Sequence, residues 1–438
     1  MEELITLPLE GLTEDSIIKV IGVGGGGCNA VNYMHRQGLK DVSFLVCNTD
    51  RQVLIKSSVP SKLQLGPGLG AGGDPETARQ YAEESRDHIR EALNDGTQML
   101  FITAGMGGGT GTGASSVVAE VAQDMGILTV GIVTIPFAFE GKKKIEKAMT
   151  GVARLAKHVD ALLIINNEKL KQIYPELNLL NAFSKSDDVV ANAARSIAEI
   201  ITVPGYINTD FADVYNTLKN GNMAIMNVGQ ASGTNRITAA IENALNSPLI
   251  NTNDVHGAKR VLLQFYFSTE HAIRMEEIQQ INHFIEEVGA EVEVQWGTTI
   301  DDTLGEDVRV TIIATGYEVS DIPSLEEVVG KKTIDEAIND NYKDEEKQPK
   351  EDEPLTEIDL TGSIQTPPAE EKKKEEKKEE EDKHAHRGND MDGEIEINFE
   401  DDTTPDKPAK QPAEPKKEEN GTRENSSIWK NWMRNRRS

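Results

Sequence analysis

Five short apolar runs, each followed by a segment with helical spacing, constrain the fold of this chain more than any other feature. The runs cover residues 17–23, 42–48, 99–104, 128–134 and 161–165. Helix patterns follow Gly27, Asp74, Gly113, Gly141 and Glu168. Nearly continuous apolar strands that alternate with helices are typical of a parallel sheet covered on both faces. We therefore expect an α/β domain over residues 16–180, preceded by a flexible leader, residues 1–15.

A long helix pattern separates this domain from a second one. The segment "DDVVANAARSIAEIIT" lies within residues 181–205, and Pro204-Gly205 is expected to end its helix. Residues 206–318 then carry three strand patterns, "AKRVLLQFYFS", "AEVEVQW" and "VRVTIIATG", and one helix pattern, "IQQINHFIEEVG". This part predicts a smaller α+β domain joined to the first by a long central helix.

The composition changes beyond residue 318. Residues 319–425 are rich in Lys and Glu with interspersed prolines and few large apolar residues, which predicts a disordered acidic linker. The last segment, residues 426–438, is "SSIWKNWMRNRRS". Its four apolar residues fall on one side of a helix. A partner-binding helix, direct contact with anionic lipid and a frayed terminus are the alternatives, and we favour the partner helix because one short basic helix anchors weakly.

Charge and cysteine content exclude several classes of protein. The net charge of −28 disfavours nucleic-acid binding, which requires a basic face. No apolar stretch is long enough to span a membrane, and the acidic N-terminus is unlike a signal peptide. The chain has two cysteines, too few for a disulfide framework. We expect a soluble protein of a reducing cytoplasm.

The first apolar run leads into glycines in "IIKVIGVGGGGCNAV", residues 17–31. The pattern Gly22-x-Gly24-x-x-Gly27, with Asp50 about twenty residues further on, resembles a dinucleotide-binding turn. A mononucleotide site and a plain strand-to-helix turn are the alternatives. Four consecutive glycines exceed what a turn requires, and they allow main-chain N–H groups to approach an anion.

Two further glycine-rich segments favour a triphosphate. "AGMGGGTGTGAS", residues 104–115, again follows a strand and precedes a helix, and "GPGLGAGGDP", residues 66–75, precedes another helix. Glycine turns on neighbouring strands can hold a chain of phosphates from both sides. A nicotinamide enzyme needs only one such turn. The P-loop pattern G-x-x-x-x-G-K-[ST] is absent from the sequence.

"GGGTGTG", together with "NTD" at 48–50, "GAGGDP" at 70–75, "PFAFEGKKK" at 136–144 and "NTDFADV" at 208–214, resembles the tubulin/FtsZ family over residues 16–318. The resemblance implies a tubulin-like GTPase that forms head-to-tail filaments and scaffolds the division ring at midcell. It also implies GTP or GDP as the bound nucleotide, with Mg²⁺ carried on the phosphates and no metal held by protein ligands. A nicotinamide-dependent oxidoreductase and a GTP-binding polymer without hydrolysis are the competing predictions.

The resemblance assigns nucleotide-binding residues in the glycine turns and the loops beside them. They are Gly25, Gly26, Gly27, Cys28, Asn29, Ala71, Gly72, Gly73, Gly107, Gly108, Gly109, Thr110, Gly111, Thr112, Gly113, Glu140, Lys144, Asn167, Phe183 and Asp188. Residues 71–73 would sense the γ-phosphate, Glu140 would hold the ribose, and Phe183 would stack on the base.

Asn167 and Asp188 would contact the edge of the base. A carboxylate can accept from guanine N1–H and the 2-amino group, which adenine lacks, so an acid here favours GTP over ATP. The alternative for Asp188 is an acid stabilised by the positive end of a helix dipole.

The segment "NTDFADV" carries the predicted catalytic residues, Asn208, Asp210 and Asp213. From the residues alone, the two acids fit a metal or water site or an ordinary helix start. The resemblance implies that this loop enters the nucleotide site of the next subunit and positions the attacking water, so that the contact is heterologous and builds an open filament. It also implies a membrane-anchoring, FtsA-like partner for the C-terminal peptide, with the membrane touched only indirectly or weakly.

The chain departs from the family pattern at four places. Lys144 stands where Arg is usual, Asp187 where Asn is usual, and Cys28 where glycine is common. A lysine contacts phosphate as a point charge rather than as a fork. The terminal peptide lacks the usual "DIPxF"-like core. None of these changes removes a required group, but nucleotide affinity and turnover are expected to differ from those of relatives.

Overall fold

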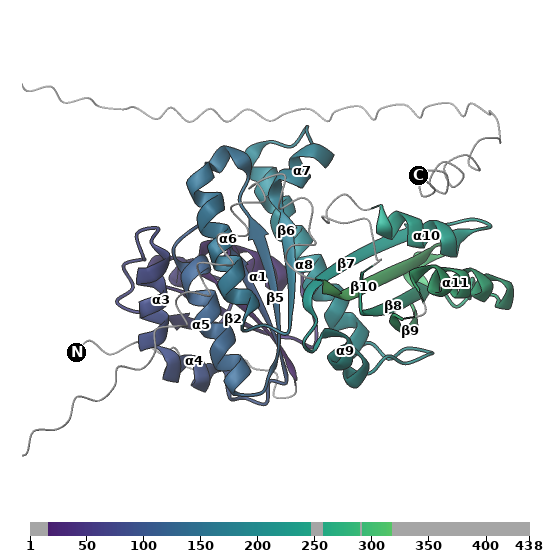
Figure 1. Cartoon of the computed structure of the whole chain (residues 1–438), viewed down its shortest axis with the longest axis horizontal. Helices are drawn as coiled ribbons and strands as arrows, with labels where there is room; N and C mark the ends of the chain where they lie inside the picture. The colour runs from purple at the N-terminus through teal and green to yellow at the C-terminus, as the bar shows by residue number, and fades with distance from the viewer. Residues whose placement is uncertain (1–15, 247–256, 290, 318–438) are drawn as a thin grey trace, which may run out of the picture. The chain divides into compact units, whose positions relative to one another are not determined.

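The computed structural model describes residues 16–246, 257–289 and 291–317. The predicted leader, acidic linker and terminal peptide lie outside these described residues. Within them, ten strands form one sheet in the order β3-β2-β1-β4-β5-β6-β7-β10-β8-β9 (Figure 1). The strands are β1 (Ile18–Val23), β2 (Ser43–Asn48), β3 (Ser61–Gln64), β4 (Met99–Gly105), β5 (Leu128–Ile135), β6 (Ala161–Asn166), β7 (Asn222–Ala231), β8 (Arg260–Phe267), β9 (Glu293–Ile300) and β10 (Val308–Tyr317).

Helices connect the strands and cover the sheet. They are α1 (Gly24–Arg36), α2 (Arg51–Lys56), α3 (Pro75–Glu84), α4 (Arg86–Leu93), α5 (Thr110–Asp124), α6 (Lys142–Ala156), α7 (Asn167–Ile173), α8 (Leu179–Thr202), α9 (Phe211–Leu218), α10 (Arg236–Leu245) and α11 (Met275–Val288), with 3₁₀ turns η1 (Ala138–Glu140) and η2 (Asp302–Leu304). Among these described helices, none is both long and apolar enough to cross a membrane.

The seven strands that lie side by side from β3 to β7, in the spatial order β3-β2-β1-β4-β5-β6-β7, all pair in parallel. The strand order reverses between β1 and β4. Ligands of open α/β sheets bind at the carboxyl ends of the strands at such a switch point. One apolar core contains residues of α4, α5 and α6, and the other contains residues of α1, α8 and α9. The parallel sheet is therefore covered on both faces, as the apolar strands predict (Figure 1).

The predicted α/β fold with a long central helix is confirmed, and the differences are local. The central helix is α8, which ends at Thr202 rather than at residue 205. Strands β3 and β7 were not predicted, because "SKLQ" is polar and "NMAIMNVGQA" carries Asn and Gln among its apolar residues. The glycines at 24–27 lie inside the first turn of α1, and Gly111 and Gly113 lie inside the first turn of α5, whereas the glycines at 107–109 precede α5.

The second region joins the parallel strands through a short contact. Strand β6 pairs with β7 only at Ala161↔Asn222 and Leu162↔Met223, after which β7, β10 and β8 run antiparallel. The sheet thus continues through the predicted domain boundary near residue 206, and the division into domains stays a prediction.

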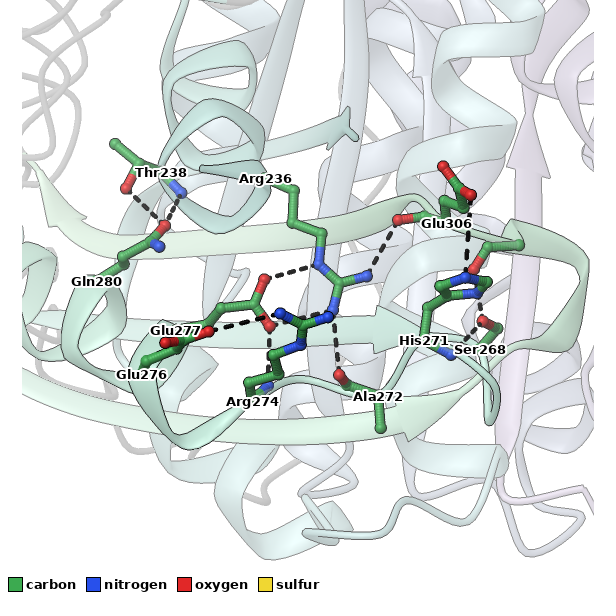
Figure 2. A network of polar contacts seen from close by, with 11 residues as sticks. Arg236, Thr238, Ser268, His271, Ala272, Arg274, Glu276, Glu277, Gln280 and Glu306 are labelled. Carbon is green, nitrogen blue, oxygen red and sulfur yellow. Dashed lines mark hydrogen bonds and ion pairs between the residues drawn. The ribbon is translucent and has the colours of Figure 1, made fainter. Parts of the chain in front are cut away.

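A buried arginine holds the helices of this second region together. Arg236 is 6% exposed and binds both carboxylate oxygens of Glu277, at 2.8 and 3.1 Å (Figure 2). It also donates to the carbonyl oxygens of Ala272 and Glu306. Because the pair is bidentate and two of the three remaining N–H donors of Arg236 are also used, the cost of burying the two charges is offset. The network connects α10 with α11 and with the loop before β10.

Candidate functional site

A cavity of about 230 Å³ lies at the carboxyl edge of the parallel strands. Its walls come from the first two turns of α1, the ends of β4 and β5, the segment that leads into and begins α6, the start of α7, and the N-terminal half of α8. This is the switch point between β1 and β4, where the fold favours a ligand. Seven of the predicted nucleotide-binding residues line it: Gly26, Asn29, Gly108, Glu140, Lys144, Asn167 and Phe183.

Two helices begin beside this cavity without a side-chain cap. Val23 precedes α1 and Gly109 precedes α5, and neither residue caps its helix through a side chain; the first turns contain no acid. By contrast, Asp74 caps α3 by accepting from the N–H of Thr77. Uncapped N-termini leave main-chain N–H groups and a positive dipole end available to an anion. The two glycine turns at the starts of α1 and α5, called the phosphate turns below (residues 24–27 and 107–113), therefore present main-chain N–H groups with which an anion could interact.

The glycines of these turns fall into two groups. A Cβ at Gly27 would lie 2.2 Å from the carbonyl oxygen of Thr103, and one at Gly111 would lie 2.5 Å from that of Gly105. At Gly25 and Gly108, in contrast, a Cβ would meet no atom within 4 Å. The first group is required by the packing of the chain itself. The second group leaves open space where a ligand can approach the backbone.

One face of α8 forms the wall of the cavity opposite the phosphate turns. Phe183, Ser186, Asp187 and Val190 line the cavity, and their spacing of three and four residues places them on one helix face. The Ser186 hydroxyl donates to the Asn167 side-chain oxygen at 2.7 Å, which fixes the orientation of that amide. This wall combines a partly exposed aromatic ring with polar groups, as a site for a base requires.

The structure places Asp187, rather than the predicted Asp188, in the cavity. Asp188 instead accepts from the Tyr33 hydroxyl at 3.0 Å and pairs with Lys185 at 2.7 Å. Asp188 points about 100° further around the helix than Asp187, and its two contacts hold it against Tyr33 and Lys185 rather than in the cavity wall. Asp187 has no hydrogen-bond partner among the described residues, and burial raises its pKa to about 7, against a smaller opposing effect of Arg36.

Glu140 and Lys144 form the rim of the cavity. A Glu140 oxygen accepts from the N–H of Phe137 at 3.0 Å, and the other lies 3.2 Å from the Lys144 ammonium. Lys144 is the one cationic side chain of the cavity wall within the described residues. Negative charge bound here would therefore interact mainly with main-chain N–H groups and helix ends.

The predicted γ-phosphate loop, residues 71–73, lies beside the cavity rather than in its wall. A Cβ at Gly109 would lie 3.2 Å from the Cβ of Ala71 and 3.1 Å from the N atom of Asp74. Gly72 and Gly73 are exposed and have positive φ angles, 59° and 75°. The loop thus lies against the start of α5, where the phosphate turn begins.

Several other predicted residues have structural contacts. The Thr112 hydroxyl is buried and accepts from the N–H of Gly107 at 2.8 Å, and the Thr110 hydroxyl lies 2.6 Å from that of Thr49. The Cys28 thiol is buried in the core, which raises its pKa to about 12, and it does not line the cavity. Asp50, the acid of the dinucleotide pattern, caps α2 and is also absent from the cavity wall.

The predicted catalytic acids begin helix α9. Asp210 is its N-cap, and Asp210 and Asp213 each accept from the main-chain N–H of the other, at 3.0 and 3.1 Å. Asn208 accepts from the N–H of Gly205 and is exposed, as is Asp210. Buried Thr209 fixes the loop by donating to Gln264 at 3.0 Å. The structure therefore brings the three predicted residues together in one exposed loop, the acid loop (residues 208–213).

The acid loop lies far from the cavity of its own chain. Ser186 is in the cavity wall, whereas Thr202 ends α8 shortly before the loop. Sixteen residues of helix separate them, which corresponds to roughly 24 Å. None of the three acid-loop residues lines the cavity.

Sequence reasoning missed part of the cavity wall. The additional lining residues are Ala30, Thr103, Ala104, Gly105, Met106, Thr134, Pro136, Ser186, Asp187 and Val190. Six of them lie in the last residues of two predicted strands or just after these strands, so the rule that ligands bind at strand carboxyl ends could have identified them. Asp187 could have been identified from its helical spacing to Phe183.

Comparisons with known proteins match both parts of the described chain. The Tubulin/FtsZ family, GTPase domain, matches residues 17–175, and the FtsZ family, C-terminal domain, matches residues 222–318. The cell division protein FtsZ of Porphyromonas gingivalis is 52% identical over 308 residues, covering 69% of this chain and 67% of that protein. The cell division protein FtsZ of Pseudomonas aeruginosa is 45% identical over 314 residues, covering 70% of this chain and 79% of that protein.

Solved structures show the same fold. An empty FtsZ dimer from M. jannaschii gives a TM-score of 0.63 at 38% identity, covering 69% of this chain and 88% of that chain. A GDP-bound CetZ1 monomer from Haloferax volcanii gives a TM-score of 0.63 at 22% identity, covering 73% of this chain and 99% of that chain. At this identity the match supports the fold alone. The chain therefore belongs to the tubulin/FtsZ family.

Proposed function

We propose that the chain hydrolyses GTP at the contact between successive subunits of a filament, with residues from two copies completing each site. The family establishes the coarser part: the chain is a guanine-nucleotide-binding GTPase that polymerises into filaments for bacterial cell division. The observation that carries the finer part is the separation of the cavity from the acid loop within one chain.

In this proposal the triphosphate lies across the first turns of α1 and α5. The uncapped helix ends and the open space at Gly25 and Gly108 support this placement. The exposed N–H groups of Gly72 and Gly73 would reach the terminal phosphate. Charge on the phosphates would be met by main-chain dipoles and by Lys144.

The guanine base would lie against Phe183 with its edge toward Asp187 and Asn167. Asp187 supports this assignment because it lines the cavity and has no other hydrogen-bond partner among the described residues. Its carboxylate would accept from N1–H and the 2-amino group of guanine. Adenine offers neither donor and would leave the carboxylate unmatched, so GTP is preferred over ATP.

Magnesium would accompany the nucleotide. In the described part of the chain, no group of three His, Cys, Asp or Glu side chains could hold a metal ion. Mg²⁺ commonly binds substrate phosphates with several waters and few protein ligands, which fits a cavity lined mainly by backbone. When bound, the ion would reduce the negative charge on the phosphate oxygens.

The acid loop of one subunit would complete the cavity of the next. Asp210 and Asp213 would accept the proton and orient the attacking water, and Asn208 would hold that water by a hydrogen bond. Such a contact joins two different surfaces, so repeating it produces an open filament. Hydrolysis would then depend on polymerisation and would be coupled to filament disassembly.

The assembled filaments would form a ring scaffold in the cytoplasm at the midcell division site. The C-terminal peptide, residues 426–438, would bind a membrane-anchoring, FtsA-like division protein, with residues 319–425 as a tether. Both segments lie outside the described residues, so this part of the proposal depends on their composition.

Complementation between two defective variants tests the proposal. Asp213→Asn keeps the cavity and disables the acid loop, whereas Asp187→Leu keeps the acid loop and disables the cavity. We expect each variant alone to hydrolyse little GTP, and an equimolar mixture to regain activity because mixed contacts pair an intact cavity with an intact loop. A mixture no more active than the sum of its parts would contradict a site shared between subunits.

A further inference from the structure

The loop of residues 71–74 is a turn closed by one hydrogen bond, in which the N–H of Asp74 donates to the Ala71 carbonyl oxygen at 2.9 Å. At one end the N–H of Gly70 donates to the Thr49 carbonyl oxygen at 2.9 Å, and at the other Asp74 caps α3. Between them, the N–H groups of Gly72 and Gly73 form no hydrogen bond with the described chain, and a Cβ at either position would meet no atom within 4 Å. The turn is thus closed within itself, while its attachment to the neighbouring helices depends on contacts made by other elements.

Helix α6 supplies those contacts. The Lys147 ammonium donates to the carbonyl oxygen of Gly73 at 2.8 Å, and Arg154 pairs with Glu76 in the first turn of α3. Lys147 and Arg154 are seven residues apart and so lie on one helix face. The two cations hold the loop and the start of α3 at two points.

The same helix contacts the nucleotide cavity. Lys144, one turn before Lys147, lines the cavity, and its carbonyl oxygen lies 2.7 Å from where a Cβ of Gly107 would be. Gly151, between Lys147 and Arg154, approaches α5 so closely that an added Cβ would lie 2.5 Å from Thr112 Cγ2. One rigid helix thus touches the cavity rim, the phosphate turn and the loop of residues 71–74.

We propose that Lys147 is a positioning residue that sets the loop of residues 71–74 over the terminal phosphate of the nucleotide. By fixing the Gly73 carbonyl, Lys147 directs the free N–H groups of Gly72 and Gly73 toward the start of α5. Only a nucleotide with a third phosphate gains from that arrangement, so the contact strengthens the preference for GTP over GDP. This inference rests on the proposed placement of GTP in the cavity.

Three substitutions in α6 of the full chain test this role. Lys147→Met removes the ammonium but keeps an aliphatic stem, and Lys147→Arg keeps a donor. Lys143→Met is the matched control, since Lys143 is exposed on the same helix and makes no hydrogen bond or ion pair with other described residues. Affinities for GDP and for a slowly hydrolysed GTP analogue would be measured by fluorescence titration below the concentration of assembly.

We expect Lys147→Met to weaken binding of the GTP analogue about threefold to tenfold, the effect of losing one hydrogen bond from a charged donor, and to leave GDP binding unchanged. Lys147→Arg should restore most of the loss, and Lys143→Met should match the parent chain. Equal weakening for both nucleotides would indicate a merely structural role and overturn the inference, as would no change for either. A parent chain that binds neither nucleotide would overturn the proposed function, and this inference with it.

Discussion

In the phosphate turns the backbone itself is packed, whereas in the acid loop the functional side chains face solvent. An added Cβ at Gly113 would lie 1.9 Å from the carbonyl oxygen of Pro75, so the packing of α3 against α5 alone requires glycine there. Asn208 and Asp210 are exposed, and Asp210 and Asp213 bond locally at the start of α9. The cavity is thus largely specified by the packing of the fold, while the acid loop exposes polar groups whose hydrogen bonds within the chain are only local.

The largest effect is expected from Gly113→Ala. The new methyl group would overlap the Pro75 carbonyl, and we expect a loss in the free energy of unfolding on the order of 3 kcal/mol or more, with loss of GTP binding. Urea unfolding and nucleotide titration would measure the two effects.

Gly25→Ala is the matched control, because its Cβ would meet no atom of the chain. The free energy of unfolding should change by no more than about 1 kcal/mol, while GTP binding weakens. If Gly25→Ala left GTP affinity intact, the open space there would not be the phosphate site.

The next largest effect is expected on GTP turnover, with little change in the free energy of unfolding. Asp213→Asn keeps a side-chain oxygen that can accept from the N–H of Asp210, so the start of α9 should remain capped. Loss of the carboxylate should reduce GTP turnover about 100-fold, a typical contribution of a general base. Steady-state phosphate release and filament sedimentation would be compared, with GTP binding expected to persist. Turnover equal to that of the parent chain would remove Asp213 from the proposed mechanism.

A smaller effect is expected from the charge of Asp187. Its pKa of about 7 means that, before nucleotide binds, the carboxyl is largely protonated at pH 6 and largely ionised at pH 8. Because guanine presents donors, it binds the ionised form, and GTP affinity should rise about tenfold between these pH values. Asp187→Asn should abolish that dependence, whereas a parent affinity independent of pH would contradict the contact with the base.

The same raised pKa affects the free energy of unfolding, measured without nucleotide, in the opposite direction. An unfolded Asp ionises near pH 4, so between about pH 4 and pH 7 the native state binds more protons than the unfolded state. The contribution of Asp187 to the free energy of unfolding therefore decreases as pH rises through this range. Asp187→Asn should remove this slope in urea unfolding of the nucleotide-free chain.

The smallest effect on catalysis is expected from removing residues 426–438. The GTPase rate per subunit should match the parent chain, because neither the cavity nor the acid loop includes this peptide. Binding to the proposed membrane-anchoring partner should be lost, as measured by co-sedimentation. A loss of GTPase activity would mean that the peptide supports the fold.

The sequence predicts the parts of the molecule that periodicity and glycine patterns control. The five apolar runs locate β1, β2, β4, β5 and β6, and the glycine segments locate the phosphate turns. It could not distinguish Asp187 from Asp188, since two adjacent acids differ only in the rotation of α8, which packing against α1 and β5 determines. The sequence also did not predict β7, because Asn and Gln interrupt its apolar pattern; the strand forms by antiparallel pairing of its backbone with β10.

The measurement that tests the central claim most directly is GTP hydrolysis per subunit across a range of protein concentrations, with sedimentation of polymer and with ATP and NADH as controls. A site completed by a second subunit predicts almost no activity below a threshold concentration and a rise that follows polymer formation, with GTP only. Specific activity that is independent of concentration would mean that each subunit carries a complete site, and would contradict the shared one.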